Sequence, residues 1–89
     1  MTQNSDHAPI ALVTGAGRGL GQGIAVELSK SGFSIAIHYG SSIDGAKQTV
    51  TKCEEVAINS NQIFRCFQAD LSDLESRNTL IPSVVNELG

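Results

Sequence analysis

Thr14-Gly-Ala-Gly-Arg-Gly-Leu-Gly-Gln-Gly23 is the stretch that decides the fold, and it directly follows the apolar run Ile10-Ala-Leu-Val13. Glycine occupies every second position from 15 to 23, which indicates a backbone that approaches another group closely. The apolar run predicts a short buried strand, and the residues after the glycines predict an amphipathic helix. The free N–H groups and the positive dipole end at the start of such a helix suit a phosphate group.

Length and composition limit what this chain can be. Its 89 residues predict at most one small domain, and 40% hydrophobic with 17% charged residues is ordinary for a globular protein. The net charge of −3 argues against a nucleic-acid partner. No apolar stretch approaches the roughly 18 residues of a membrane span, so we expect no membrane partner. Residues 1–8, with His7, predict a flexible polar lead.

The two cysteines, Cys53 and Cys66, have neither the spacing of metal ligands nor a secretory context. We therefore expect reduced, partly buried thiols in a cytoplasmic protein and no metal site.

Strand and helix patterns alternate along the chain. Strands are expected at 10–13, 33–39 and 63–69. The first helix is expected at 20–31, with Gly32 as its left-handed stop. The expected inward-facing residues of that helix are Leu20, Ile24, Ala25 and Leu28. Those of the second helix are Ile43, Ala46, Val50, Cys53 and Ala57.

The third helix follows residues 70–73, and Pro82 interrupts its pattern. Proline does not fit unbroken into a helix interior, so we expect a kink or a late start near residues 78–79. The expected inward-facing residues are Leu80, Ile81, Val84, Val85 and Leu88.

This alternation predicts an α/β fold with three parallel strands in the order 3-2-1, one half of a doubly wound Rossmann sheet. Right-handed crossovers place the first two helices on one face and the third helix on the other. The first strand has the pattern of a strand buried on both faces, so it predicts a fourth strand beside it. Residues 9–89 are therefore expected to form a partial dinucleotide-binding domain that stops before that strand.

The glycine spacing distinguishes between kinds of phosphate site. No glycine precedes a lysine as in the Walker motif, and G-x-G-x-x-G fits in no register. Thr14, Gly15, Gly19 and Gly21 do fit Thr-Gly-x-x-x-Gly-x-Gly. This motif, with Asp70-Leu71 after the third strand, resembles the short-chain dehydrogenase/reductase family, and most closely its 3-oxoacyl-carrier-protein reductases.

The glycines have separate expected roles. Gly15 permits the tight exit from the strand, Gly19 lets the backbone approach a pyrophosphate, and Gly21 allows close packing of the helix. By resemblance, Leu20 belongs to the same cofactor-binding segment. The alternative is a flexible turn without a ligand.

The end of the second strand bears on the choice of cofactor. A site that prefers NAD carries a carboxylate there, whereas here the first one is Asp44, inside the next helix. We therefore favour NADP(H) over NAD(H). The residues expected around the 2′-phosphate are Arg18, Ser41, Ser42 and, when protonated, His38. Tyr39, beside them, is also expected to bind the cofactor. Arg18 could instead be a surface cation, and the serines helix caps.

The resemblance implies that Asp70 accepts a hydrogen bond from the adenine amino group and that the Leu71 backbone contacts the ring. The alternative is that Asp70 or Ser72 only caps the following helix.

No catalytic residue is expected in this chain. The family's Tyr-x-x-x-Lys pair is absent, because Ile43 stands four residues after Tyr39, the only tyrosine. The family's Asn-Asn-Ala-Gly segment is also absent, and residues 86–89 correspond to those just ahead of the fourth strand. The resemblance implies a longer, often homo-oligomeric oxidoreductase that transfers hydride between NADP(H) and a carbonyl or alcohol, plausibly a 3-oxoacyl thioester. These 89 residues alone are expected to be inactive.

Two other interpretations stay open. The chain could be a truncated, inactive nucleotide-binding or partner-binding module whose open sheet edge is covered by another chain. It could also be a flavodoxin-like nucleotide binder with the same topology.

Overall fold

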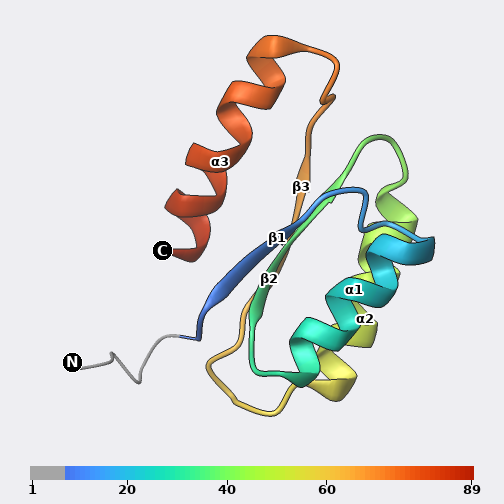
Figure 1. The fold of residues 1–89 in the computed structure, drawn as a ribbon, viewed down its shortest axis with the longest axis vertical. Coiled ribbons are helices and arrows are strands. Elements are labelled where there is room, and N and C mark those ends of the chain that lie inside the picture. The colour runs from blue at the N-terminus through green and yellow to red at the C-terminus, as the bar shows by residue number, and fades with distance from the viewer. Residues whose placement is uncertain (1–7) are drawn as a thin grey trace.

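The computed structural model describes residues 8–89 and contains alternating strands and helices (Figure 1). The elements are β1 (Ile10–Val13), α1 (Gly19–Lys30), β2 (Ser34–Tyr39), α2 (Ile43–Val56), β3 (Phe64–Gln68) and α3 (Leu74–Leu88). The boundaries of the strands lie within one residue of those expected. The lead predicted for residues 1–8, with His7, falls outside the described residues except for its last position.

The three strands form a parallel sheet in the order β1-β2-β3, as predicted. Leu12 of β1 pairs with Ala36 of β2, which in turn pairs with Arg65 of β3. Helices α1 and α2 lie together on one face of the sheet, and α3 lies on the other (Figure 1). The glycine segment, Ser41 and Asp70 all follow the carboxyl ends of strands and so meet at one edge.

Alternation along β2 divides the core in two. Ile35 and Ile37 are fully buried on the face covered by α1 and α2. Ala36, between them, is buried on the other face, together with Leu80 and Val84 of α3. The central strand is thus covered on both sides. In β1, the strand whose pattern predicted burial on both faces, only Val13 is buried.

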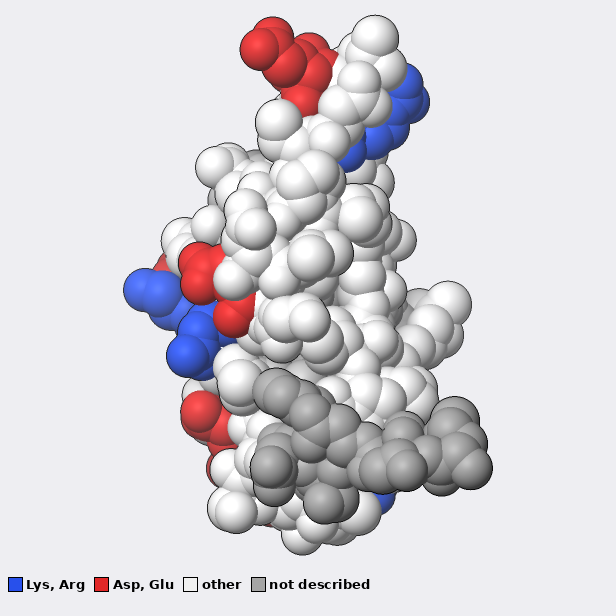
Figure 2. Space-filling model, turned by 90° about the vertical axis from the view of Figure 1, so that its left-hand side faces the viewer, with Lys and Arg blue, Asp and Glu red and all other residues white. Residues whose placement is uncertain are grey.

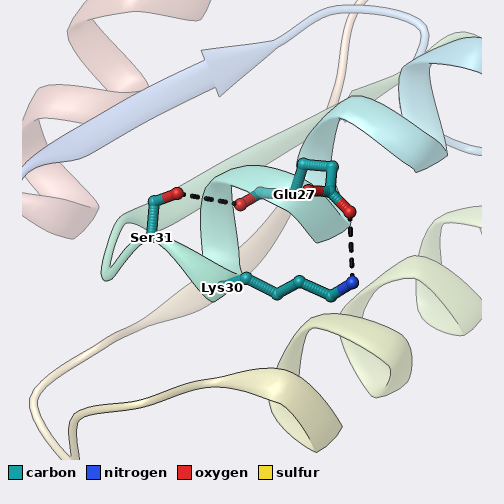
Figure 3. Close-up of polar contacts among 3 residues, drawn as sticks. All are labelled: Glu27, Lys30 and Ser31. Carbon is teal, nitrogen blue, oxygen red and sulfur yellow. Dashed lines mark hydrogen bonds and ion pairs between the residues drawn. The ribbon is translucent and has the colours of Figure 1, made fainter.

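Helix α1 ends at the predicted glycine. Gly32 has a φ of +97°, and its N–H donates to the carbonyl of Ser29 over 3.0 Å. In the last turn, Lys30 and Glu27 form an ion pair of 3.1 Å, and the Ser31 hydroxyl donates to the Glu27 carbonyl (Figure 3). Because both charges are exposed, this pair adds little stability. The left-handed glycine ends the helix.

Some apolar residues of α1 and α3 that the prediction placed inward are exposed. Leu20 is 82% and Ile24 is 44% exposed, because α1 turns Ala25 and Ser29 toward the sheet instead. Ile81 and Val85 are also more than half exposed, since Leu80, Val84 and Leu88 form the side of α3 that meets the sheet. Ile43 of α2 is exposed too. The inward positions predicted for Leu20, Ile24, Ile43, Ile81 and Val85 were therefore wrong for this chain. Figure 2, viewed from the side of β1 and α3, shows a mostly uncharged surface.

For α3 a kink or a late start was predicted, and the late start was wrong. The helix begins at Leu74, where the carboxylate of Asp73 accepts a hydrogen bond from the Ser76 N–H over 3.3 Å, and it continues through Pro82. Proline removes one N–H bond, but Leu80 and Val84 on either side of it are buried against the sheet. Packing therefore keeps the helix continuous. None of the helices in residues 8–89 has both the length and the apolar character to cross a membrane.

Candidate functional site

Residues 14–18, which we call the glycine loop, connect β1 to α1 at the carboxyl edge of the sheet. Gly15 in the loop and Gly19 at the start of α1 both have a φ of +61°, a conformation that side chains rarely adopt. No atom lies within 4 Å of the Cβ that either glycine would carry. These two glycines are therefore required by the backbone path itself, and they leave open space beside it.

Gly21 is required for a different reason. A Cβ at this position would overlap the carbonyl oxygen of Gly15 and lie 2.8 Å from its carbonyl carbon. The first turn of α1 thus packs directly on the glycine loop. The prediction gave Gly21 a role in close helix packing; in the structure the close neighbour is the loop rather than the sheet.

The start of α1 is open to an anion. Arg18 is the N-cap residue, and its side chain makes no capping hydrogen bond. The first turn carries no acidic residue. The first N–H groups of a helix have no partner within it, and the helix dipole makes this end positive. The backbone around Gly19, Leu20 and Gly21 therefore suits a phosphate group.

A small open hollow of about 170 Å³ adjoins the glycine loop. It brings together five of the predicted residues, from the glycine loop and from the end of β2 with the loop after it. Its lining consists of Gly15, Gly17, Arg18, Tyr39, Gly40, Ser41 and Ser42. Ser42 also caps α2, since its hydroxyl oxygen accepts from the Gly45 N–H over 3.3 Å. No Asp or Glu lines this hollow.

A second open hollow, of about 630 Å³, continues along the same edge. It is lined by His38, Gly40, Ser41, Gln68, Ala69, Asp70, Leu71 and Ser72. Because Gly40 and Ser41 line both hollows, the two form one continuous surface. The predicted residues Asp70 and Leu71 therefore lie on the same surface as Arg18.

Asp70 begins the segment 70–73, which we call the β3 turn. Its carboxylate accepts hydrogen bonds from the hydroxyl and the N–H of Ser72, at 2.6 and 2.9 Å. These two bonds, the hydroxyl first, hold the pKa of the Asp70 carboxyl below its usual value. Asp73, not Asp70 or Ser72, caps α3, so the alternative that gave those two residues only a capping role was wrong.

His38 has a different environment from the one predicted. It is buried, with 4% of its surface exposed. Its Nδ1 lies 3.0 Å from the Gly15 nitrogen and its Nε2 lies 2.9 Å from the Ala69 carbonyl oxygen. A protonated His38 that contacts a 2′-phosphate is incompatible with this arrangement, because backbone groups occupy both ring nitrogens. His38 instead holds the glycine loop in place through its contact with the Gly15 N–H.

Two supporting residues escaped the sequence analysis, and both lie on α2. The Thr49 hydroxyl donates to the Ala16 carbonyl over 2.6 Å and accepts from the Gln22 side chain over 2.9 Å. A Cβ on Gly45 would overlap the carbonyl oxygen of Gly17. Gly45 could have been noticed, since a glycine inside a helical pattern often marks close packing.

The cysteines contribute no nucleophile. Burial, followed by the charge of Glu54, raises the pKa of the Cys53 thiol to about 11, and burial also raises the pKa of Cys66. Both stay protonated near neutral pH, and protonated thiols react slowly. Within residues 8–89, no group of three or more His, Cys, Asp or Glu side chains is arranged to hold a metal ion.

Comparison with known proteins agrees with this geometry. The family model described as short chain dehydrogenase matches residues 9–89. The chain is 41% identical over 80 residues to the hydroxynaphthalene reductase arp2 of Aspergillus fumigatus, which covers 90% of this chain and 28% of that protein. It is 34% identical over 79 residues to the 3-oxoacyl-[acyl-carrier-protein] reductase FabG of Staphylococcus aureus, which covers 89% and 30%.

A solved structure gives the same result. The acetoin dehydrogenase YohF of Salmonella typhimurium superimposes with a TM-score of 0.80 at 28% identity, over 91% of this chain and 32% of that one. This chain therefore spans about three tenths of the length of these relatives. The family match extends over nearly all of the described residues. By its fold, its glycine loop and this match, the chain belongs to the short-chain dehydrogenase family.

Proposed function

We propose that this chain is the cofactor-binding part of an NADP(H)-dependent reductase, which transfers hydride between the nicotinamide and a carbonyl or alcohol substrate. The observation that carries the proposal is the open start of α1, which has no side-chain cap and no acid in its first turn. The diphosphate would lie against the backbone of Gly15, Gly19, Leu20 and Gly21, where the helix dipole favours negative charge.

The preference for NADP(H) over NAD(H) rests on the first hollow. Its lining includes one cation, Arg18, and the hydroxyl residues Ser41 and Ser42, but no carboxylate to repel a 2′-phosphate. Tyr39 lines the same hollow and would border the ribose. Arginine binds phosphate through charge-assisted hydrogen bonds, so Arg18 is the residue that would distinguish the two cofactors.

Adenine would bind in the second hollow. Asp70 and Leu71 line it at the carboxyl end of β3. The lowered pKa keeps the Asp70 carboxyl ionised near neutral pH, and an ionised carboxylate can accept a hydrogen bond from an amino group. Leu71 would contact the ring through its backbone.

The substrate belongs to the proposal as well. One relative is named as a reductase of 3-oxoacyl-[acyl-carrier-protein] and another as a hydroxynaphthalene reductase. A carbonyl compound fits both names, and a 3-oxoacyl thioester is our specific candidate. The nicotinamide would supply the hydride chemistry, and the residues of this chain would bind and orient the cofactor. We place the protein, as a homo-oligomer, in the cytoplasm, where its two thiols would stay reduced.

The test is calorimetric titration of the full-length gene product with NADP⁺ and with NAD⁺. We expect tighter binding of NADP⁺, and we expect Arg18→Ala to weaken it by roughly tenfold to a hundredfold while NAD⁺ binding changes little. Arg77→Ala is the matched control, since Arg77 is exposed on α3 and lines neither hollow. Failure to bind either nucleotide would overturn the proposal.

A second candidate applies to these 89 residues alone: nucleotide binding without catalysis. It is favoured by the single tyrosine, Tyr39, which has Ile43 and not lysine four residues later. We expect the full-length product, but not this segment, to oxidise NADPH with a carbonyl substrate. Turnover by the segment alone would contradict this candidate.

A further inference from the structure

His38 connects three strand ends at the proposed cofactor site. It lies near the end of β2, its Nδ1 faces the Gly15 N–H of the glycine loop, and its Nε2 faces the Ala69 carbonyl after β3. The two backbone partners are 23 and 31 residues away in sequence. A single buried ring therefore links the glycine loop, which follows β1, to the residue that follows β3 on the other side of the sheet.

The two contacts determine the protonation state of the ring. The Gly15 N–H can only donate, so Nδ1 must accept and carry no proton. The Ala69 carbonyl can only accept, so Nε2 must carry the proton. Both bonds exist together only in the neutral Nε2–H tautomer. A second proton, on Nδ1, would face the Gly15 N–H and break that bond.

We infer that His38 is a positioning residue that makes dinucleotide binding depend on pH: the neutral ring holds the glycine loop in its binding shape, and protonation releases it. The inference rests on the proposed function. Histidine is the side chain whose ordinary charge change falls between about pH 5 and 8. Because only the neutral ring makes both bonds, protons compete with them, and affinity falls as the pH falls.

Charged groups lie on two of the segments beside His38. Asp70 is the one charged residue that lines the same hollow. Arg18 lies on the glycine loop, which His38 contacts at Gly15. The other charged residues on β3, the β3 turn and α3 are exposed to solvent: Arg65, Asp73, Glu75, Arg77 and Glu87. Residues of β1 carry no charge.

The test compares the full-length protein with its His38→Asn variant. The asparagine oxygen can accept from the Gly15 N–H near the position of Nδ1, but the amide does not titrate. As the pH is lowered from about 8 to 5.5, the Kd for NADP⁺ should rise. We expect this rise to be about tenfold larger in the natural protein than in the variant. At the higher pH the variant should bind several-fold more weakly, because the bond to Ala69 is lost.

Two controls isolate the histidine. NAD⁺ is titrated in parallel, because the 2′-phosphate of NADP⁺ itself titrates in this range. His7→Asn removes the other histidine of this chain and should leave the pH response intact. Equal pH responses in the natural protein and His38→Asn would overturn the inference.

A measurement without nucleotide separates this inference from the proposed function. Long-range ¹H–¹⁵N spectra of the free protein should show a proton on Nε2 and none on Nδ1 at neutral pH. The Gly15 amide resonance should then titrate together with the ring. If the protein binds no dinucleotide at any pH, the proposed function fails and the binding part of the inference fails with it. If it binds while the Gly15 amide does not titrate, only the inference fails.

Discussion

The glycine loop and the β3 turn lie at the same edge of the sheet, but they are held in different ways. The glycine loop depends on distant residues: His38 binds Gly15 across 23 positions, and Thr49 binds Ala16 across 33. The β3 turn depends on near neighbours, since Asp70 binds Ser72 two residues away and Ser76 six residues away.

This difference has a consequence for function. A loop held by distant contacts takes its shape only when the rest of the domain has folded, and substitutions on other elements can deform it. A turn held by its own side chains is sensitive to local substitutions alone. The glycine loop should therefore respond to changes in α1, α2 and β2, whereas the β3 turn should respond mainly to changes within residues 70–76.

Gly21→Ala should have the largest effect, because it breaks the contact between α1 and the glycine loop. The new Cβ would overlap the Gly15 carbonyl oxygen, so the helix or the loop must shift. We expect the free energy of unfolding to fall by about 2–4 kcal/mol and NADP⁺ binding to be lost. Urea unfolding and calorimetry measure the two effects.

Gly23→Ala is the matched control, two residues further along the same helix. Nothing lies within 4 Å of its added Cβ. Alanine favours a helix more than glycine does, so this change should stabilise the protein by about 0.5–1 kcal/mol. Equal effects of the two substitutions would mean that the close approach at Gly21 does not exist.

Thr49→Val should have an intermediate effect, because it removes the distant support of the glycine loop while keeping the side-chain shape. The Ala16 carbonyl would lose the hydroxyl that now binds it at 2.6 Å. We expect a loss of about 1–3 kcal/mol in unfolding free energy and weaker NADP⁺ binding. Thr51→Val, at an exposed position of α2, should change neither. A Thr49 variant with full affinity would contradict the distant-support account.

Ser72→Ala should have the smallest effect, confined to the β3 turn. The hydroxyl bond, the larger cause of the lowered pKa, is lost while the backbone N–H bond remains, so the pKa of Asp70 should rise part of the way toward its ordinary value. At pH values above the ordinary pKa of a carboxyl group, the lowered pKa of Asp70 stabilises the folded protein. This contribution is lost as the pH falls through the lowered pKa. Carboxyl NMR titration measures the shift. Any weakening of the glycine loop in this variant would remove the distinction between the two regions.

The contrast between local and distant contacts also explains which features the sequence predicted and which it did not. Strand positions, sheet order and the Gly32 stop follow from local patterns, and all were confirmed. The partners of His38 and Thr49 lie more than 20 residues away, so spacing alone could not identify them. The apolar stripe of α1 was misplaced at Leu20 because periodicity does not show which side of a helix meets the sheet.

The start of α3 shows the same limit. Pro82 argues locally for a break, and burial of its neighbours against β2 and β3 outweighs that preference. For the site, most of the residues predicted to bind the cofactor line the two hollows, and His38 lines the second, but a protonated ring that contacts a phosphate does not fit its backbone partners. Its type and position suggested a ligand contact, and only the folded arrangement shows that backbone groups occupy the ring.

The most direct test of the account is an amide-resolved NMR titration of the full-length protein with NADP⁺. If the diphosphate binds at the open start of α1, the amide resonances of residues 15–21 should shift. Their shifts should saturate at the same NADP⁺ concentration as the calorimetric signal. Saturable binding that leaves these amides unchanged, or no binding at all, would contradict it.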